Sequence, residues 1–125
     1  MFLRLCAGFA LAMMTAAPAL AASACGSPPV APASIDGKTA TEAQLKDAVS
    51  DFKTFQTESD TYQSCLLADL KKQEAEAARS NPPKTLDPAI PQMINAQVND
   101  NQKLKEKVGG ELNGAIIAYK AKHPG

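Results

Sequence analysis

The sequence predicts an all-α protein: a long antiparallel two-helix hairpin, similar to a coiled coil, with an extended proline-rich N-terminal arm after a cleaved signal peptide. Apolar residues recur three and four positions apart in two segments, and prolines separate these segments. An apolar leader and a proline-rich stretch precede them. We therefore divide the chain into a signal peptide at 1–21, an arm at 22–40, a first helix at 41–80, a linker at 81–90 and a second helix at 91–122.

Residues 1–21 have the features of a secretory signal peptide. The basic residue Arg4 precedes an apolar run, and Ala19-Leu20-Ala21 forms an A-x-A cleavage signal. We expect cleavage between Ala21 and Ala22, which predicts a periplasmic or secreted protein.

Two alternatives for the leader stay open, and only these would hold the chain at a membrane. The leader would act as an uncleaved anchor if its apolar run crossed the bilayer, but the run is short for a span of about 20 residues. Cleavage after Ala24 would instead expose Cys25 for lipidation, as in bacterial lipoproteins. The leucine usual three residues before such a cysteine is absent, because Ala22 stands there.

Cleavage of the leader removes Cys6 and leaves two cysteines, Cys25 and Cys65. An even number in an exported chain predicts a disulfide. The residues between Cys25 and Thr41 reach up to about 50 Å when extended, whereas Cys65 lies about 36 Å along the helix from Thr41. The arm can therefore fold back over the first helix. The alternative is two unrelated thiols.

The arm is rich in prolines, which fix φ and remove backbone donors, and it ends in an Asp36-Gly37 turn. This composition predicts an extended segment of polyproline II type. We expect a spacer or strap. The alternative is a docking motif for aromatic grooves, which are found mainly in cytosolic signalling modules.

The first helix begins with a capping box, in which Thr41 and Gln44 exchange hydrogen bonds. Its apolar residues form a narrow stripe that suits pairing with another helix. Ser59 fills the one gap in this stripe, and Asn101 interrupts the corresponding stripe of the second helix. The stripes comprise Leu45, Val49, Phe52, Phe55, Tyr62, Leu66 and Leu70 in the first helix, and Ile94, Val98, Leu104, Val108, Leu112, Ile116 and Tyr119 in the second.

Gly109, Gly110 and Gly114 lie inside the predicted second helix, where each costs about 1 kcal/mol relative to alanine. If Arg79 and Ile90 flank the bend symmetrically, Phe55 faces Gly114 and Ser59 faces Gly110. We therefore expect Gly110 and Gly114 to allow close packing against the aromatic residues of the first helix. A hinge is the alternative. The predicted packing set is Phe52, Phe55, Tyr62, Gly110 and Gly114.

We predict no enzyme and no catalytic, cofactor or metal site. The one histidine, His123, stands next to Pro124 near the last residue, so no positioned base is evident for a serine or cysteine nucleophile. No histidine or cysteine pair has metal-ligand spacing. The near-neutral charge of the chain gives no electrostatic footprint for nucleic acid.

The chain contains several short motifs: Pro28-Pro29, Ile35-Asp36-Gly37, Ala40-Thr41, Phe52, Tyr62-Gln63-Ser64-Cys65-Leu66 and Asn113-Gly114-Ala115-Ile116. Together these motifs resemble small exported, periplasmic helical proteins of unassigned function from Gram-negative bacteria. The resemblance implies an envelope location and a helical hairpin, and it carries over no functional residue.

These features predict an exported structural or interaction protein of the cell envelope that pairs with itself or with an envelope protein. Leu67, Leu70, Ile117 and Ala118 would stay partly exposed to solvent in a monomer, which favours a homodimer forming a four-helix bundle. A disulfide-linked monomer whose arm covers these residues is the alternative. The alternative function is a periplasmic chaperone-like or inhibitor protein that holds clients through its helices, although such surfaces favour methionine and only Met93 follows the leader.

Overall fold

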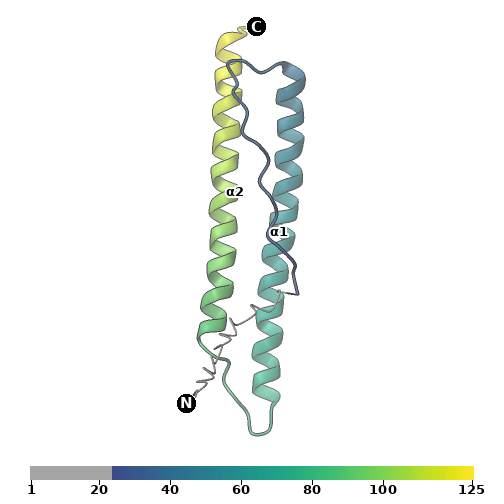
Figure 1. Cartoon of the computed structure of the whole chain (residues 1–125), viewed down its shortest axis with the longest axis vertical. Coiled ribbons are helices and arrows are strands. Elements are labelled where there is room, and N and C mark those ends of the chain that lie inside the picture. The colour runs from purple at the N-terminus through teal and green to yellow at the C-terminus, as the bar shows by residue number, and fades with distance from the viewer. Residues whose placement is uncertain (1–23) are drawn as a thin grey trace, which may run out of the picture.

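The computed structural model describes residues 24–125, and within them the regular elements are two long helices. Helix α1 spans Glu42–Arg79 and helix α2 spans Ala89–Lys122. They run antiparallel and side by side, and the arm crosses the hairpin from the middle of α1 to the end where α1 begins (Figure 1). The predicted helical hairpin is confirmed. The predicted signal peptide and its cleavage site lie outside the described residues.

The capping box predicted at the start of α1 is present. The Thr41 side chain accepts a hydrogen bond from the Gln44 backbone N–H at 3.2 Å, and Gln44 Oε1 accepts from the Thr41 N–H at 2.9 Å. Glu42 adds a carboxylate to the first turn, where the helix dipole favours negative charge. A hydrogen bond from Lys46 and its positive charge lower the pKa of Glu42.

Helix α1 ends where prolines begin, since the residue before a proline avoids the α region. Ser80 closes the helix, and its hydroxyl donates to the Ala77 carbonyl at 2.7 Å. The linker then turns back along the last turn of α1, where the Lys84 N–H donates to the same Ala77 carbonyl at 3.0 Å. As a result, α2 starts beside α1 rather than beyond its end (Figure 1).

Helix α2 begins at Ala89, two residues before the predicted start at 91. Asp87 Oδ1 accepts a hydrogen bond from the Ala89 N–H at 2.9 Å, so a carboxylate satisfies one of the first N–H groups. Pro91 is tolerated because it stands in the first turn, where an N–H has no partner inside the helix.

The main cluster of buried side chains lies in the half of the hairpin nearer the linker. Leu66 is almost fully buried and packs with Tyr62, Leu70 and Ile94. Half-buried residues from the arm, the linker and α2 complete the cluster, namely Cys25, Leu86, Ile90 and Val98. The arm and linker therefore add apolar cover that two helices alone lack, and burying each large apolar side chain stabilises the fold by about 1.5–3 kcal/mol.

The register between the helices differs from the symmetric bend that the sequence analysis assumed. Asn101 contacts Ser59 and Gln63 across the hairpin, and Lys105 forms an ion pair with Asp60. Ser59 was expected to face Gly110 but forms a hydrogen bond with Asn101, which lies about two and a half turns earlier in α2, because the linker folds back along α1 before α2 begins. The expected pairing of Phe55 with Gly114 was therefore wrong.

Candidate functional site

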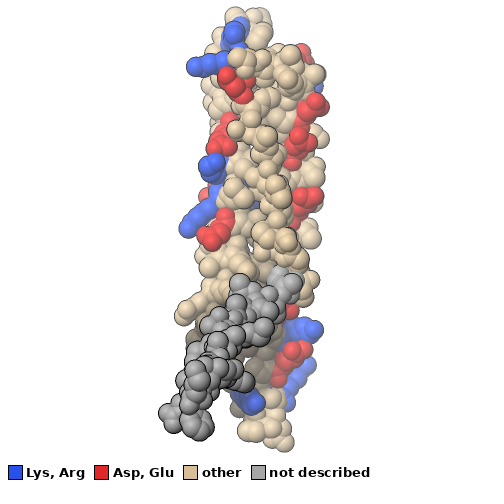
Figure 2. Space-filling view, in the orientation of Figure 1, with Lys and Arg blue, Asp and Glu red and all other residues tan. Residues whose placement is uncertain are grey.

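The candidate site is the groove between α1 and α2 that the arm occupies, which we call the arm groove. Figure 2 shows the face that carries it: charged side chains line the two long edges of the hairpin, and mostly uncharged atoms fill the strip between them. The most deeply buried groove residues come from both helices, with Phe55 and Tyr62 on α1 and Val108 and Ala115 on α2. The arm thus covers an apolar surface bordered by charge.

A disulfide between Cys25 and Cys65 fixes one end of the arm, as predicted. The two Cα atoms lie 5.7 Å apart, which places the start of the arm against the middle of α1. Gly26 follows with a φ of 73°, a left-handed conformation that glycine adopts at little cost. The chain can therefore turn directly from the disulfide into the extended arm.

The other end of the arm is fixed by a tight turn. The Asp36 carbonyl accepts hydrogen bonds from the N–H groups of Thr39 at 3.2 Å and Ala40 at 2.9 Å. Gly37 is packed so closely on α2 that an added Cβ would lie 1.8 Å from the Ala115 carbonyl oxygen. Lys122 Nζ also donates to the Lys38 carbonyl at 2.8 Å. Only glycine fits at 37, so this corner has one defined position.

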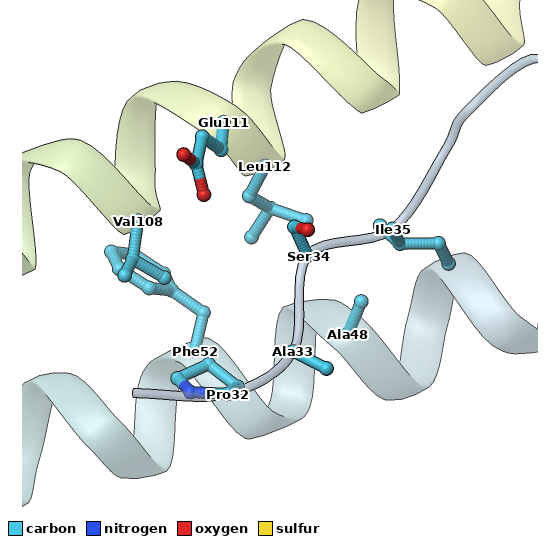
Figure 3. Close-up of a pocket in the computed structure, with 9 residues that line it drawn as sticks. All are labelled: Pro32, Ala33, Ser34, Ile35, Ala48, Phe52, Val108, Glu111 and Leu112. Atoms are coloured by element: carbon cyan, nitrogen blue, oxygen red, sulfur yellow. The ribbon is translucent and has the colours of Figure 1, made fainter. Parts of the chain in front are cut away.

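Between these ends, the arm lies against the helices through side-chain packing. Within the described structure, no hydrogen bond joins residues 27–35 to either helix, as expected for a proline-rich extended segment. Pro32 and Ile35 of the arm line one small pocket together with Ala48 and Phe52 of α1 and Leu112 of α2 (Figure 3). A space of about 20 Å³ remains there, enough for one water molecule. Val30 points away and is 88% exposed.

A buried polar layer crosses the hairpin halfway along its length. Asn101 Nδ2 donates to the Ser59 hydroxyl at 3.3 Å, and Asn101 Oδ1 accepts from Gln63 Nε2 at 2.8 Å. Ser59 is 0% exposed and Asn101 is also buried. The two residues that interrupt the apolar stripes in the sequence are therefore hydrogen-bonding partners.

The predicted close packing at Gly110 and Gly114 was wrong. Both glycines are exposed, and a Cβ added to either would meet nothing within 4 Å. Close glycine contacts occur instead at Gly37 and at Gly109, where an added Cβ would lie 3.1 Å from Phe52 Cζ. The predicted packing residues Phe55 and Tyr62 are buried and Phe52 is half-buried.

Four apolar residues at a spacing of five helical turns form a set that we call the rear face. Val49 and Leu67 are 18 positions apart in α1, and so are Val98 and Ile116 in α2, so each pair recurs on one helix side after five turns. Leu67 is 41% exposed and the other three are half-buried. Of the other residues expected to be partly exposed in a monomer, Ala118 is half-buried and Ile117 is 60% exposed, whereas the expectation was wrong for Leu70, which is buried.

The described residues contain no group of three metal-ligating side chains. His123 is exposed and stacks on Tyr119 with ring centroids 4.3 Å apart. None of the helices in residues 24–125 is long and apolar enough to cross a membrane.

The fold and the arm groove define a class: a helical hairpin whose extended N-terminal arm is fixed to it by a disulfide. No family model matches the sequence, and neither a curated protein nor a solved structure matches the chain. The resemblance to small exported helical proteins therefore stays a hypothesis that rests on the motifs alone.

Proposed function

We propose that this chain is an exported structural or interaction protein of the cell envelope, without a catalytic role. The observation that carries the proposal is the Cys25–Cys65 disulfide, which holds the arm on the hairpin. Disulfides persist in oxidising compartments such as the bacterial periplasm. The signal-peptide features of residues 1–21 support the same location.

The partner is a second copy of the chain or another envelope protein. The rear face supports self-association. Along each helix its two apolar residues are separated by polar residues, such as Gln63 in α1 and Lys105 in α2. A two-fold axis through the middle of the rear face would place the apolar residues of one copy against those of the other, and the polar residues likewise, as an isologous dimer requires. Two hairpins joined in this way would form a four-helix bundle.

Intact mass and cell fractionation test the export part of this proposal. We expect the protein from an exporting cell to begin at Ala22, to carry no lipid, and to lack the two hydrogens that a disulfide removes. A full-length chain in the cytosol with two free thiols would contradict the proposal. A diacylglycerol on Cys25 would replace the disulfide and make the protein a lipoprotein.

In-cell photo-crosslinking tests the interaction part. A photoreactive residue at Leu67, on the rear face, should form discrete adducts, whereas the same residue at the exposed position Glu74 serves as a control for collisions. An adduct of twice the chain mass identifies a second copy, and a heavier adduct identifies another envelope protein. Equal, diffuse labelling from both positions would count against a specific partner.

A further inference from the structure

The arm is held in its groove at its two ends. The Cys25–Cys65 disulfide fixes the first end, and the contact of Gly37 with Ala115 fixes the second. The residues from 27 to 35 contribute packing without a hydrogen bond to the helices. Such a segment has no sequence-specific backbone pairing with the groove, so an equivalent extended chain can occupy the same surface.

The groove selects for a definite type of chain. Its floor is formed by Ala48, Phe52, Phe55, Val108 and Leu112, which are apolar. Polyproline II segments leave their backbone groups solvated and lose little conformational entropy on binding, which suits a groove of this kind. The tight site at Ala115 adds a requirement for glycine at one position.

We propose that the arm groove is a binding site for an extended, proline-containing segment of another protein, and that the Cys25–Cys65 disulfide decides whether the arm or that segment occupies it. The inference rests on the proposed interaction role and deepens it by naming the site and the chemistry of the partner. The arm is then a resident occupant that blocks the site while the disulfide is intact.

The disulfide is placed where a reductant can reach it. Cys25 and Cys65 are half-buried and border a surface depression that is also lined by Thr57, Glu58 and Thr61. A thiolate of a dithiol reductant attacks one sulfur and forms a mixed disulfide, which releases the other cysteine as a thiolate. The second thiol of the reductant then resolves the mixed disulfide. Cys25 and Cys65 end as thiols and the reductant ends as a disulfide, so two electrons and two protons are transferred.

The probe is a synthetic peptide with the sequence of residues 27–38, which has the chemistry of the groove's own occupant and contains no cysteine. It is titrated into the ¹⁵N-labelled oxidised protein and into the Cys25→Ser/Cys65→Ser variant, with the amide signals of Val108 and Ala115 as the readout. We expect the peptide to bind the variant at least about tenfold more tightly than the oxidised protein. In the oxidised protein the fixed arm leaves the groove open in only a small fraction of the molecules.

Two matched controls separate binding in the groove from adhesion elsewhere. A peptide with Gly37→Ala should fail to bind, since its Cβ would collide with the Ala115 carbonyl. Gly37→Ala in the protein's own arm should tighten binding of the unmodified peptide further, because the second anchor is also lost. Gly110→Ala in the protein should leave the affinity unchanged, as that position is open.

The outcomes are decisive in either direction. Selective binding to the serine variant with rejection of the alanine peptide supports the proposal. Equal binding to oxidised and serine proteins, or no binding to the serine protein at millimolar peptide, overturns it. A serine variant that sediments at twice the mass of the oxidised protein and does not bind the peptide overturns it in favour of arm exchange between copies. If the serine variant unfolds, Gly110→Ala and Gly114→Ala are introduced into it to stabilise α2, so that the titration is still made on a folded hairpin. Export and the disulfide are tested separately by intact mass, so the proposed function can stand if the groove fails to bind.

Discussion

Asn101 of α2 donates a hydrogen bond to the hydroxyl of Ser59 in α1, and this contact joins two helices at positions 42 residues apart in the sequence. A buried polar pair inside an apolar stripe fixes register, because any displacement leaves both groups without partners in a low-dielectric interior. The observed register fits this pair and the neighbouring contact of Asn101 with Gln63.

Replacement of Asn101 by leucine should lower the free energy of unfolding by about 1–3 kcal/mol, since the Ser59 hydroxyl loses this partner in a buried site. The Ser59→Ala/Asn101→Leu double variant should recover most of the loss, because both polar groups are then absent. Urea unfolding of the two single variants and the double variant measures this coupling. Strictly additive losses would show that the pair does not act as a unit.

Alanine at Gly110 or Gly114 should raise the free energy of unfolding by up to about 1 kcal/mol each. Both positions are exposed inside α2, and an added Cβ meets no neighbour within 4 Å. The gain reflects the conformational entropy that glycine loses in a helix. Thermal unfolding followed by circular dichroism tests this, with Gly37→Ala as the contrasting variant that should lower stability. A lower melting temperature for Gly114→Ala would restore the close-packing interpretation.

Serine at both Cys25 and Cys65 should lower the free energy of unfolding by about 4 kcal/mol in the chain-entropy model, since the disulfide closes a loop of about 40 residues. Urea unfolding of the variant and of the reduced protein should agree, because both lack the same link. Thiol labelling of the unreduced, denatured protein should find almost no free cysteine. A loss below about 1 kcal/mol would indicate that the hairpin owes little to its arm.

The sequence predicted the helices because their signals are local. The Thr41 and Gln44 capping box, the prolines after α1 and the spacing of apolar residues each act within a few positions, and the structure confirms them. The disulfide was also predictable, because two cysteines remained and the arm could span the distance between them. These inferences need no knowledge of how the helices meet.

The register and the arm's second anchor could not be predicted in the same way. The register depends on the linker folding back onto Ala77 and on Asn101 finding Ser59, which are contacts between distant residues. Asp36-Gly37 was recognised as a turn, but nothing local indicates that Gly37 meets Ala115. The pairing of Ser59 with Asn101 was the one available signal, since each is the lone polar residue in its stripe.

The rear face leads to a last prediction, that the protein self-associates through Val49, Leu67, Val98 and Ile116. Leu67→Lys should shift the equilibrium to monomer, because a charged ammonium would be buried opposite an apolar partner surface. The hairpin itself should keep its helicity, since Leu67 is 41% exposed within one chain.

Ile117→Lys is the matched control, because Ile117 is 60% exposed and points to another side of α2. Sedimentation equilibrium across micromolar concentrations makes the comparison. We expect twice the chain mass for the unmodified protein and the control, and one chain mass for Leu67→Lys. A single chain mass for all three would reject self-association and leave another envelope protein as the partner of this face.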